Sequence, residues 1–137
     1  MTHSYTPKGF QTATPYFIVQ DAAKLAEFLT QAFGAVEENL MRSEEGKITH
    51  AELRVGTTIL ELSDAQGPFP PRTNTLHLFV EDTDSCYRKA LEAGAVSLYE
   101  PGDMPYGERS AGIEDPFGNH WYLATFQRGE GKGYYEE

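Results

Sequence analysis

The chain has 137 residues, of which 39% are hydrophobic, and this length and composition suit one folded domain with a real core. Its 21 acidic and 11 basic residues give a formal net charge of −10, which would repel a phosphate backbone and argues against nucleic acid as a partner. No apolar run approaches the roughly 18 residues of a membrane span, and the start lacks a signal-peptide pattern. We therefore expect a cytoplasmic protein that does not enter a membrane. The single cysteine, Cys86, should pack as a small hydrophobe.

Two stretches of the chain resemble each other. The first, TPYFIVQDAAKLAEFLTQAFGAV, covers residues 14–36, and the second, TLHLFVEDTDSCYRKALEAGAV, covers residues 75–96. Each begins with the alternation typical of a strand and continues with apolar residues at helical spacing. Short carboxylates and glycines stand where the two helices should begin and end, namely Asp21, Asp82, Gly34 and Gly94.

Three strand-like stretches follow each predicted helix. They are VEENLMR, THAELRV and TILELS in the first half, and VSLYE, RSAGIE and HWYLATF in the second. Turns are predicted at Gly46, at Gly56 and in the segment DPFGN. The sequence therefore predicts an α+β fold of two tandem βαβββ modules.

The predicted domain spans residues 10–127 and has three parts. The modules cover residues 10–64 and 74–127, and a proline-rich linker, residues 65–73, joins them. Residues 128–137 lack periodicity, so we expect a loose tail unless Tyr134 and Tyr135 dock on a neighbour or over the cavity.

Several short motifs, in this order and spacing, resemble the glyoxalase, bleomycin-resistance protein and extradiol-dioxygenase superfamily, also called the vicinal oxygen chelate fold. The motifs are TPYFIV, AFGA, HAELRVG, LHLFVED, YGERSAG and DPFGNHWYLAT, and they are most similar to the PhnB-like branch. The resemblance implies a cupped mixed sheet with the helices outside, a small-molecule cavity in the cup and, commonly, a homodimer. In the enzymes of the superfamily, four side chains from the first and last strands of each module hold a divalent metal.

The internal repeat locates those four positions in this chain. The first strands begin at Thr14 and Thr75, and the offset between them (75 − 14) is the same as the offset that pairs Glu61 with Tyr122 (122 − 61). Only Glu61 is a donor that a divalent ion prefers, because hydroxyls and a phenol are poor ligands at neutral pH. We therefore expect neither a metal nor another cofactor at these positions.

Strand alternation offers one displaced metal site. Glu61, His77 and His120 share the predicted cup face, and two histidines with one carboxylate suit iron or zinc. Both histidines lie one pleat, roughly 6 to 7 Å, from the family's ligand positions. The alternative is that they are polar lining or surface residues, and His50 is expected at a rim or strand surface.

The same alternation predicts the lining of the cavity. Aromatic rings with a few polar anchors are typical of small-molecule pockets. The predicted ligand-binding residues are Thr14, Tyr16, Ile59, Glu61, Thr75, His77, Phe79, Arg109, His120 and Tyr122. Arg109 could clamp an anionic group or pair with Glu108 or Asp103. Residues of the opposite parity should form the core against the helices, namely Phe17, Val19, Leu76, Leu78, Trp121 and Leu123.

Three functions follow from these features. The first is metal-independent binding of a small aromatic or cationic molecule, with Glu61 as charge partner and Tyr16, Phe79 and Tyr122 as stacking surfaces. The second is an enzyme of the same fold, a lyase, isomerase or dioxygenase, that uses the displaced metal set or Glu61 as a catalytic general base. The third is a regulatory or interaction module whose cup is closed.

Overall fold

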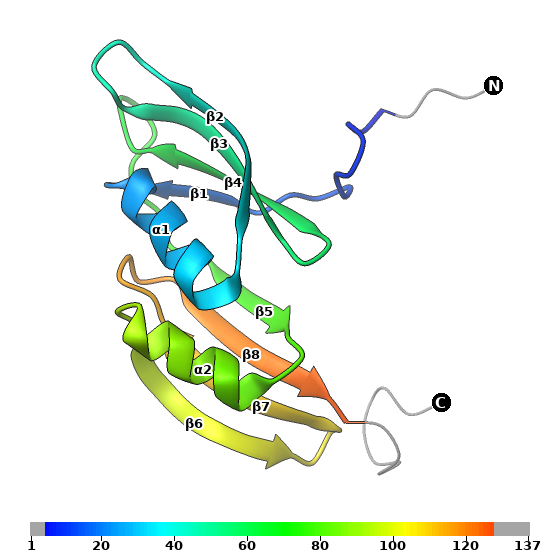
Figure 1. Cartoon of the computed structure of the whole chain (residues 1–137). Helices are drawn as coiled ribbons and strands as arrows, with labels where there is room; N and C mark the ends of the chain where they lie inside the picture. Colours follow the sequence, from blue (N-terminus) through cyan, green and yellow to red (C-terminus); the bar gives the residue numbers. More distant parts are fainter. Residues whose placement is uncertain (1–4, 128–137) are drawn as a thin grey trace, which may run out of the picture. The chain divides into compact units, whose positions relative to one another are not determined.

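The structure, a computed structural model, describes residues 5–127 (Figure 1). The chain forms two compact units. Unit one runs to Thr30 and continues with Gly34–Arg72, and unit two combines Gln31–Phe33 with the residues from Thr73 onward. Neither helix in the described range is long and apolar enough to cross a membrane. The predicted tail lies outside the described residues.

Unit one carries the first βαβββ module. Its elements are β1 (Tyr16–Val19), α1 (Ala22–Phe33), β2 (Val36–Arg42), β3 (Ile48–Val55) and β4 (Thr58–Asp64). The strand order is β1-β4-β3-β2, in which β1 runs parallel to β4 and the other neighbours are antiparallel. Parallel strands need a long connection between them, and here α1, β2 and β3 connect β1 to its parallel partner β4.

Unit two repeats this arrangement. Its elements are β5 (Thr75–Phe79), α2 (Thr83–Glu92), β6 (Val96–Met104), β7 (Glu108–Glu114) and β8 (His120–Phe126). The strand order β5-β8-β7-β6, with β5 parallel to β8, matches that of unit one. The predicted α+β fold of two βαβββ modules is thus confirmed.

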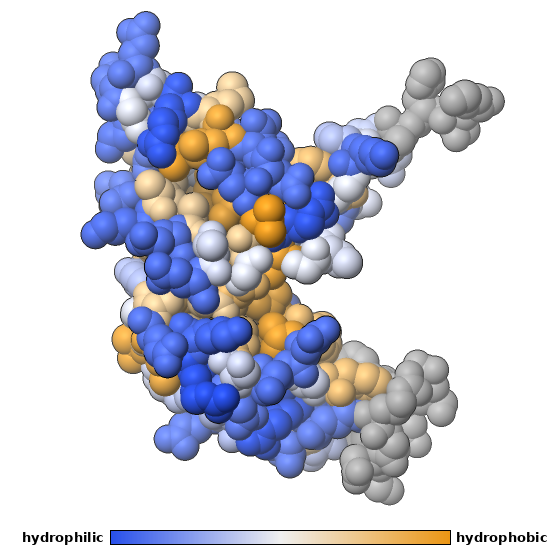
Figure 2. Space-filling model, viewed as in Figure 1, coloured by the Kyte–Doolittle hydropathy of each residue, from blue (hydrophilic) through white to orange (hydrophobic). Residues whose placement is uncertain are grey.

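Both helices begin at the predicted aspartates. The Asp21 carboxylate accepts a hydrogen bond from the backbone N–H of Lys24, and the Asp82 carboxylate accepts one from the backbone N–H of Ser85. Each bond satisfies an amide that the first helical turn leaves without an intrahelical partner. The outward surface over α2 is mostly hydrophilic (Figure 2).

The helix ends differ from each other. Gly34 caps α1 in the left-handed conformation, with φ 71°, as predicted. The C-cap of α2 is Ala93, and the glycine with positive φ, Gly94 at 113°, follows one residue later. The prediction of Gly94 as the end of the helix was therefore displaced by one position, although glycine still supplies the positive φ that the chain needs to turn back.

The predicted core lies between each sheet and its helix. Phe17, Val19, Trp121 and Leu123 are buried, with at most 3% of each exposed. Leu76 and Leu78 are only half-buried. They lie opposite Trp121 and Leu123 in the register, but β5 is the edge strand of its sheet, so one flank of these leucines has no neighbouring strand within the unit.

Cys86 on α2 also belongs to the core. Its Sγ lies 3.8 Å from the carbonyl oxygen of Ala32, and burial raises the pKa of the thiol to about 11. The thiol therefore stays protonated at neutral pH, which removes the thiolate that a nucleophilic cysteine needs.

Two segments are more regular than predicted. β6 continues beyond the predicted VSLYE through Pro101 to Met104, with register shifts on both sides of Tyr99. Proline is tolerated there because β6 is an edge strand. Within the predicted linker, Gln66 and Phe69 form an isolated bridge.

A buried carboxylate organises the turn between β7 and β8. Oδ1 of Asp115 accepts from the backbone N–H groups of Phe117 and Asn119, and Oδ2 accepts from the side chains of Asn119 and Trp121. Asn119 in turn accepts a bond from the backbone N–H of Asn74, just before β5. The segment predicted only as a turn therefore also positions the core tryptophan and the start of β5.

Asp64 has a comparable role in unit one. Its carboxylate accepts from the backbone N–H of Ala22 at 2.8 Å and from that of Ile48 at 2.7 Å. These bonds hold the beginning of α1 and the beginning of β3 at the end of β4.

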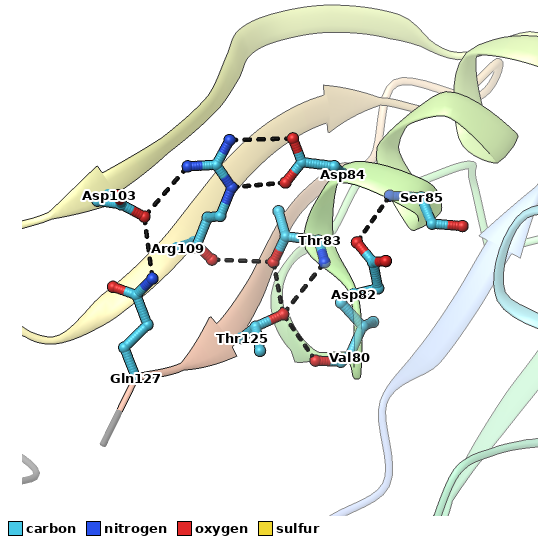
Figure 3. Close-up of polar contacts among 9 residues, drawn as sticks. All are labelled: Val80, Asp82, Thr83, Asp84, Ser85, Asp103, Arg109, Thr125 and Gln127. Atoms are coloured by element: carbon cyan, nitrogen blue, oxygen red, sulfur yellow. Dashed lines mark hydrogen bonds and ion pairs between the residues drawn. The ribbon is translucent and has the colours of Figure 1, made fainter. Parts of the chain in front are cut away.

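An ion-pair network holds α2 against its sheet (Figure 3). Nε and Nη2 of Arg109, on β7, donate to the two carboxylate oxygens of Asp84, and Nη1 donates to Asp103. Gln127 also donates to Asp103. The bonds to Asp84 and then to Asp103 raise the pKa of Arg109, and the bond from Arg109 lowers the pKa of Asp84. Both donor edges of Arg109 are thus engaged by carboxylates of this chain.

We expect Asp115→Ala to lower the free energy of unfolding by at least about 3 kcal/mol, because four donors, two of them buried side chains, lose a charged acceptor at once. Urea denaturation measures this change. Glu92→Gln, an exposed change on α2, is the control and should leave stability nearly unchanged. A loss below about 1 kcal/mol in Asp115→Ala would contradict the organising role.

A second prediction concerns acid stability. Because the pKa of Asp84 is lowered in the folded protein, its contribution is present above its ordinary value of 3.8 and is lost as the pH falls through the folded-state value. Asp84→Asn should therefore be less stable than the wild type at pH 7, by a modest amount since the pair is partly exposed. The difference should shrink between pH 5 and pH 2. A difference that stays constant over this range would contradict the prediction.

Candidate functional site

Each sheet has one face against its helix and one face that the helix does not cover, here called the helix-free face. In unit one, strand alternation places Tyr16 of β1, Glu61 of β4 and His50, Glu52 and Arg54 of β3 on this face. Phe17, Leu62 and Leu53, their neighbours along the strands, are buried on the other face. The helix-free face of unit one therefore carries a group of ionisable side chains from β3 and β4 near the centre of the sheet.

Two carboxylates oppose each other in the middle of this face. Glu52 and Glu61 are direct partners in the antiparallel register of β3 and β4. Like charges in this position destabilise a sheet. The nearby cation, Arg54, donates instead to Glu38 at 2.9 Å. Among residues 5–127, no hydrogen bond reaches the Glu61 carboxylate.

His50 completes a group with the two glutamates. Its Nε2 lies 2.9 Å from a carboxylate oxygen of Glu52, with 28% of the imidazole side chain and 19% of the glutamate exposed. One ligand atom from each of His50, Glu52 and Glu61 lies within 4.8 Å of the other two. This spacing is compatible with a single cationic group or ion bound by all three.

An aromatic ring flanks the group. Tyr16 is the parallel partner of Glu61, and its ring centroid lies 6.1 Å from that of His50. Tyr16 is 40% exposed, so part of its ring is available for contact. Ile59, predicted to line the cavity, is only 1% exposed, and its backbone N–H and carbonyl both bond to the side chain of Gln11.

The four positions that correspond to the family's metal ligands do not suit a divalent ion. Thr14 and Glu61 lie in unit one, and Thr75 and Tyr122 lie in unit two. Three of the four donors are neutral hydroxyl or phenol oxygens, which bind such ions weakly. The donors at these four predicted positions therefore do not fit the divalent ion that the fold family implies.

The helix-free face of unit two is built around a tyrosine that lies on a glycine. A Cβ on Gly112 would come within 2.4 Å of the Tyr99 ring, so only glycine leaves room for it. The Tyr99 hydroxyl lies 2.8 Å from Ser110 Oγ, and its ring centroid lies 6.2 Å from that of Tyr122. The aromatic character predicted for this face through Tyr122 and Phe79 thus includes a third ring that the sequence did not single out.

Two histidine–glutamate pairs occupy the same face. His77 Nε2 lies 3.0 Å from Glu108 Oε2, and His120 Nε2 lies 3.1 Å from Glu114 Oε1. The glutamates differ, because Glu108 is 1% exposed at its side chain and Glu114 is 43% exposed. The displaced metal set of Glu61, His77 and His120 stays a prediction, and within unit two each of its histidines already has a carboxylate partner.

Arg109, predicted at the cavity mouth, lies on the face of β7 toward α2. Alternation along β7 separates it from Glu108 and Ser110, and its guanidinium pairs with Asp84 and Asp103. Pairing with Asp103 was one of the two predicted alternatives, and Asp84 was not foreseen.

The sequence alone did not single out Glu52 or Glu108 as site residues, and it predicted His50 at a rim or strand surface. A signal for the first group was present in HAELRV, where His50 and Glu52 are two residues apart and so must share a strand face. Their approach to Glu61 depends on the β3–β4 register, which alternation alone does not determine.

Comparisons with known proteins agree with this architecture. The family model described as the Glyoxalase/Bleomycin resistance protein/Dioxygenase superfamily matches residues 11–123. An uncharacterized protein of Mycobacterium tuberculosis strain H37Rv, Rv0887c, is 35% identical in an alignment of 121 residues, and the match covers 80% of this chain and 71% of that protein.

Two solved structures are similar in fold. TioX from Micromonospora sp. ML1 has a TM-score of 0.71 at 20% identity and covers 83% of this chain and 98% of its own. The PhnB protein from Bacillus cereus has a TM-score of 0.65 at 19% identity and covers 84% of this chain and 99% of its own. With two βαβββ modules and a match over most of its length, the chain belongs to the glyoxalase/bleomycin resistance protein/dioxygenase superfamily.

Proposed function

We propose that the protein binds a small aromatic cation on the helix-free face of unit one, without a metal. The opposed carboxylates of Glu52 and Glu61 are the observation that carries this proposal. They would share the positive charge, and the exposed part of Tyr16 would contact the ring of the ligand. The homodimer expected for this family stays a prediction.

Electrostatics favours a cation at this place. Two carboxylates that face each other raise the free energy of the ligand-free sheet, and a bound cation would remove that repulsion as well as add attraction. At an effective dielectric constant of about 20, one charge pair at 4 Å is worth roughly 4 kcal/mol before the cost of desolvation. The formal net charge of −10 would also draw cations toward the protein.

An aromatic ring on the ligand is favoured by Tyr16. A cation over the face of a tyrosine gains about 0.5–2 kcal/mol, and burial of apolar ring surface adds roughly 25 cal/mol per Å². Together these terms favour a compound that carries its positive charge on or beside an aromatic ring.

The test uses 1-methyl-4-phenylpyridinium as cationic probe and 4-phenylpyridine, neutral at pH 8, as an analogue of similar shape. We expect Glu61→Gln to weaken binding of the cation about tenfold, or about 1.4 kcal/mol, and binding of the neutral analogue less than twofold. Isothermal titration calorimetry measures both. Glu92→Gln removes the same formal charge from α2 and should change neither affinity.

The same variant should gain stability. Without ligand, Glu61→Gln removes the repulsion from Glu52, so its free energy of unfolding should rise by about 0.5 kcal/mol at low ionic strength. Equal loss of both probes, together with unchanged stability, would contradict the charge-partner role. Failure of the wild type to bind either probe would contradict the proposal and favour a closed interaction module.

One observation favours a second candidate function. The ligand atoms of His50, Glu52 and Glu61 are close enough for one ion, and one imidazole with two carboxylates suits zinc, manganese or iron. This set would support a metal-dependent enzyme of the superfamily. It differs from the displaced set predicted from the sequence, because all three residues come from one sheet.

His50 distinguishes the two candidates. If an organic cation is the ligand, His50→Ala should retain binding of 1-methyl-4-phenylpyridinium within about threefold, since both carboxylates remain. If a divalent ion is the ligand, purified wild type should contain about one metal per chain by elemental analysis, and His50→Ala should lose it. Our proposal expects no stoichiometric metal in either protein. A bound metal that is lost in His50→Ala would contradict the proposal and support the metal-dependent enzyme instead.

A further inference from the structure

Unit two contains a carboxylate that is buried but only half satisfied. The side chain of Glu108 is 1% exposed, and one of its oxygens, Oε2, lies 3.0 Å from His77 Nε2. The other oxygen, Oε1, is buried and has no hydrogen-bond partner among residues 5–127. A buried carboxylate with one unpaired oxygen is costly, so its retention calls for an explanation beyond packing.

The sheet brings this pair together across a small residue. In the two registers His77 of β5 lies opposite Tyr122 and Glu108 of β7 lies opposite Phe126, so Ala124 of β8, which is fully buried, stands midway between them. A larger residue at this position would separate His77 from Glu108. The two side chains can meet over Ala124, which leaves the imidazole rather than the carboxylate at the surface.

The buried carboxylate determines what His77 presents. Nε2 of the imidazole lies 3.0 Å from Oε2 of Glu108, and the tautomer that donates from Nε2 leaves the Nδ1 lone pair as an acceptor. A carboxylate behind a histidine fixes the orientation of the ring and which of its nitrogens faces a ligand. The side chain of His77 is 39% exposed, so a ligand can reach it.

An aromatic surface lies beside this acceptor. The ring centroid of Phe79 is 4.7 Å from that of His77, the two planes are inclined at 57°, and Phe79 is 55% exposed. An exposed phenylalanine next to this imidazole can contact the ring of a ligand while the imidazole accepts a hydrogen bond from the same ligand.

We propose that the His77–Glu108 pair is a binding site for aromatic hydroxyl compounds, such as phenols, whose O–H donates to Nδ1 of His77. The site lies within unit two and is independent of the cation site proposed for Glu52 and Glu61. Phenols match it because they combine a ring for Phe79 with a hydroxyl that is a stronger donor than an aliphatic alcohol.

The chain supplies a matched comparison. His120 and Glu114 form a similar pair on the same sheet face, at 3.1 Å, and the imidazole side chain of His120 is 37% exposed. Its glutamate, however, is 43% exposed and therefore solvated. If the buried carboxylate is what makes the site, only the His77–Glu108 pair should discriminate between a phenol and its methyl ether.

The experiment compares binding of 4-cyanophenol and of its methyl ether, 4-methoxybenzonitrile, by calorimetry at pH 7. We expect the wild type to bind the phenol at least fivefold more tightly than the ether. The double variant H77L/E108L, which leaves no unpaired buried charge, should lose this preference. The matched double variant H120L/E114L should keep it, and Glu108→Gln should reduce it while retaining a polar partner for His77.

Far-UV circular dichroism and thermal unfolding verify that each variant is folded. Equal affinity of the wild type for the two probes, binding of neither probe, or loss of the preference in H120L/E114L would overturn the proposal. None of these outcomes depends on whether unit one binds a cation.

Discussion

Each module of this protein has four strands but only one helix, so the helix can cover only one face of the sheet. Residues of one parity are buried against the helix, as Phe17 and Trp121 are, and residues of the other parity lie on a face that the helix does not cover. Buried carboxylates at Asp64 and Asp115 hold the strand ends and the helix in place. The fold thus leaves one face of each sheet uncovered by its helix, while the other face and the turns provide stability.

The two helix-free faces use this freedom in different ways. In unit one the face carries like charges in direct opposition, an arrangement that costs stability and that the proposed cation would relieve. In unit two the same strand positions carry glycine, serine and tyrosine, and the ionisable groups form histidine–glutamate pairs at either side. The internal repeat therefore preserves the backbone arrangement while the side chains on the helix-free face differ between the two units.

Much of the fold could be predicted from the sequence, because periodicity and capping are local signals. VEENLMR and HWYLATF correspond residue for residue to β2 and β8, and Asp21 and Asp82 cap the helices. The candidate sites were less predictable because they depend on register. Glu52 meets Glu61 only through the pairing of β3 with β4, and Glu108 of β7 contacts His77 of β5 only because β8 pairs with both strands. Glu61 was found because the repeat placed it, whereas its partner had no such marker.

The central claim is that the opposed carboxylates of unit one bind the charge of an aromatic cation. The most direct test is a crystal structure of the protein grown with 1-methyl-4-phenylpyridinium, which shows where the probe lies. The account predicts the pyridinium ring within about 4 Å of the carboxylates of Glu52 and Glu61, with an aromatic contact to Tyr16. A probe bound elsewhere would contradict it, whether Glu52 and Glu61 then contact a metal ion or no ligand at all.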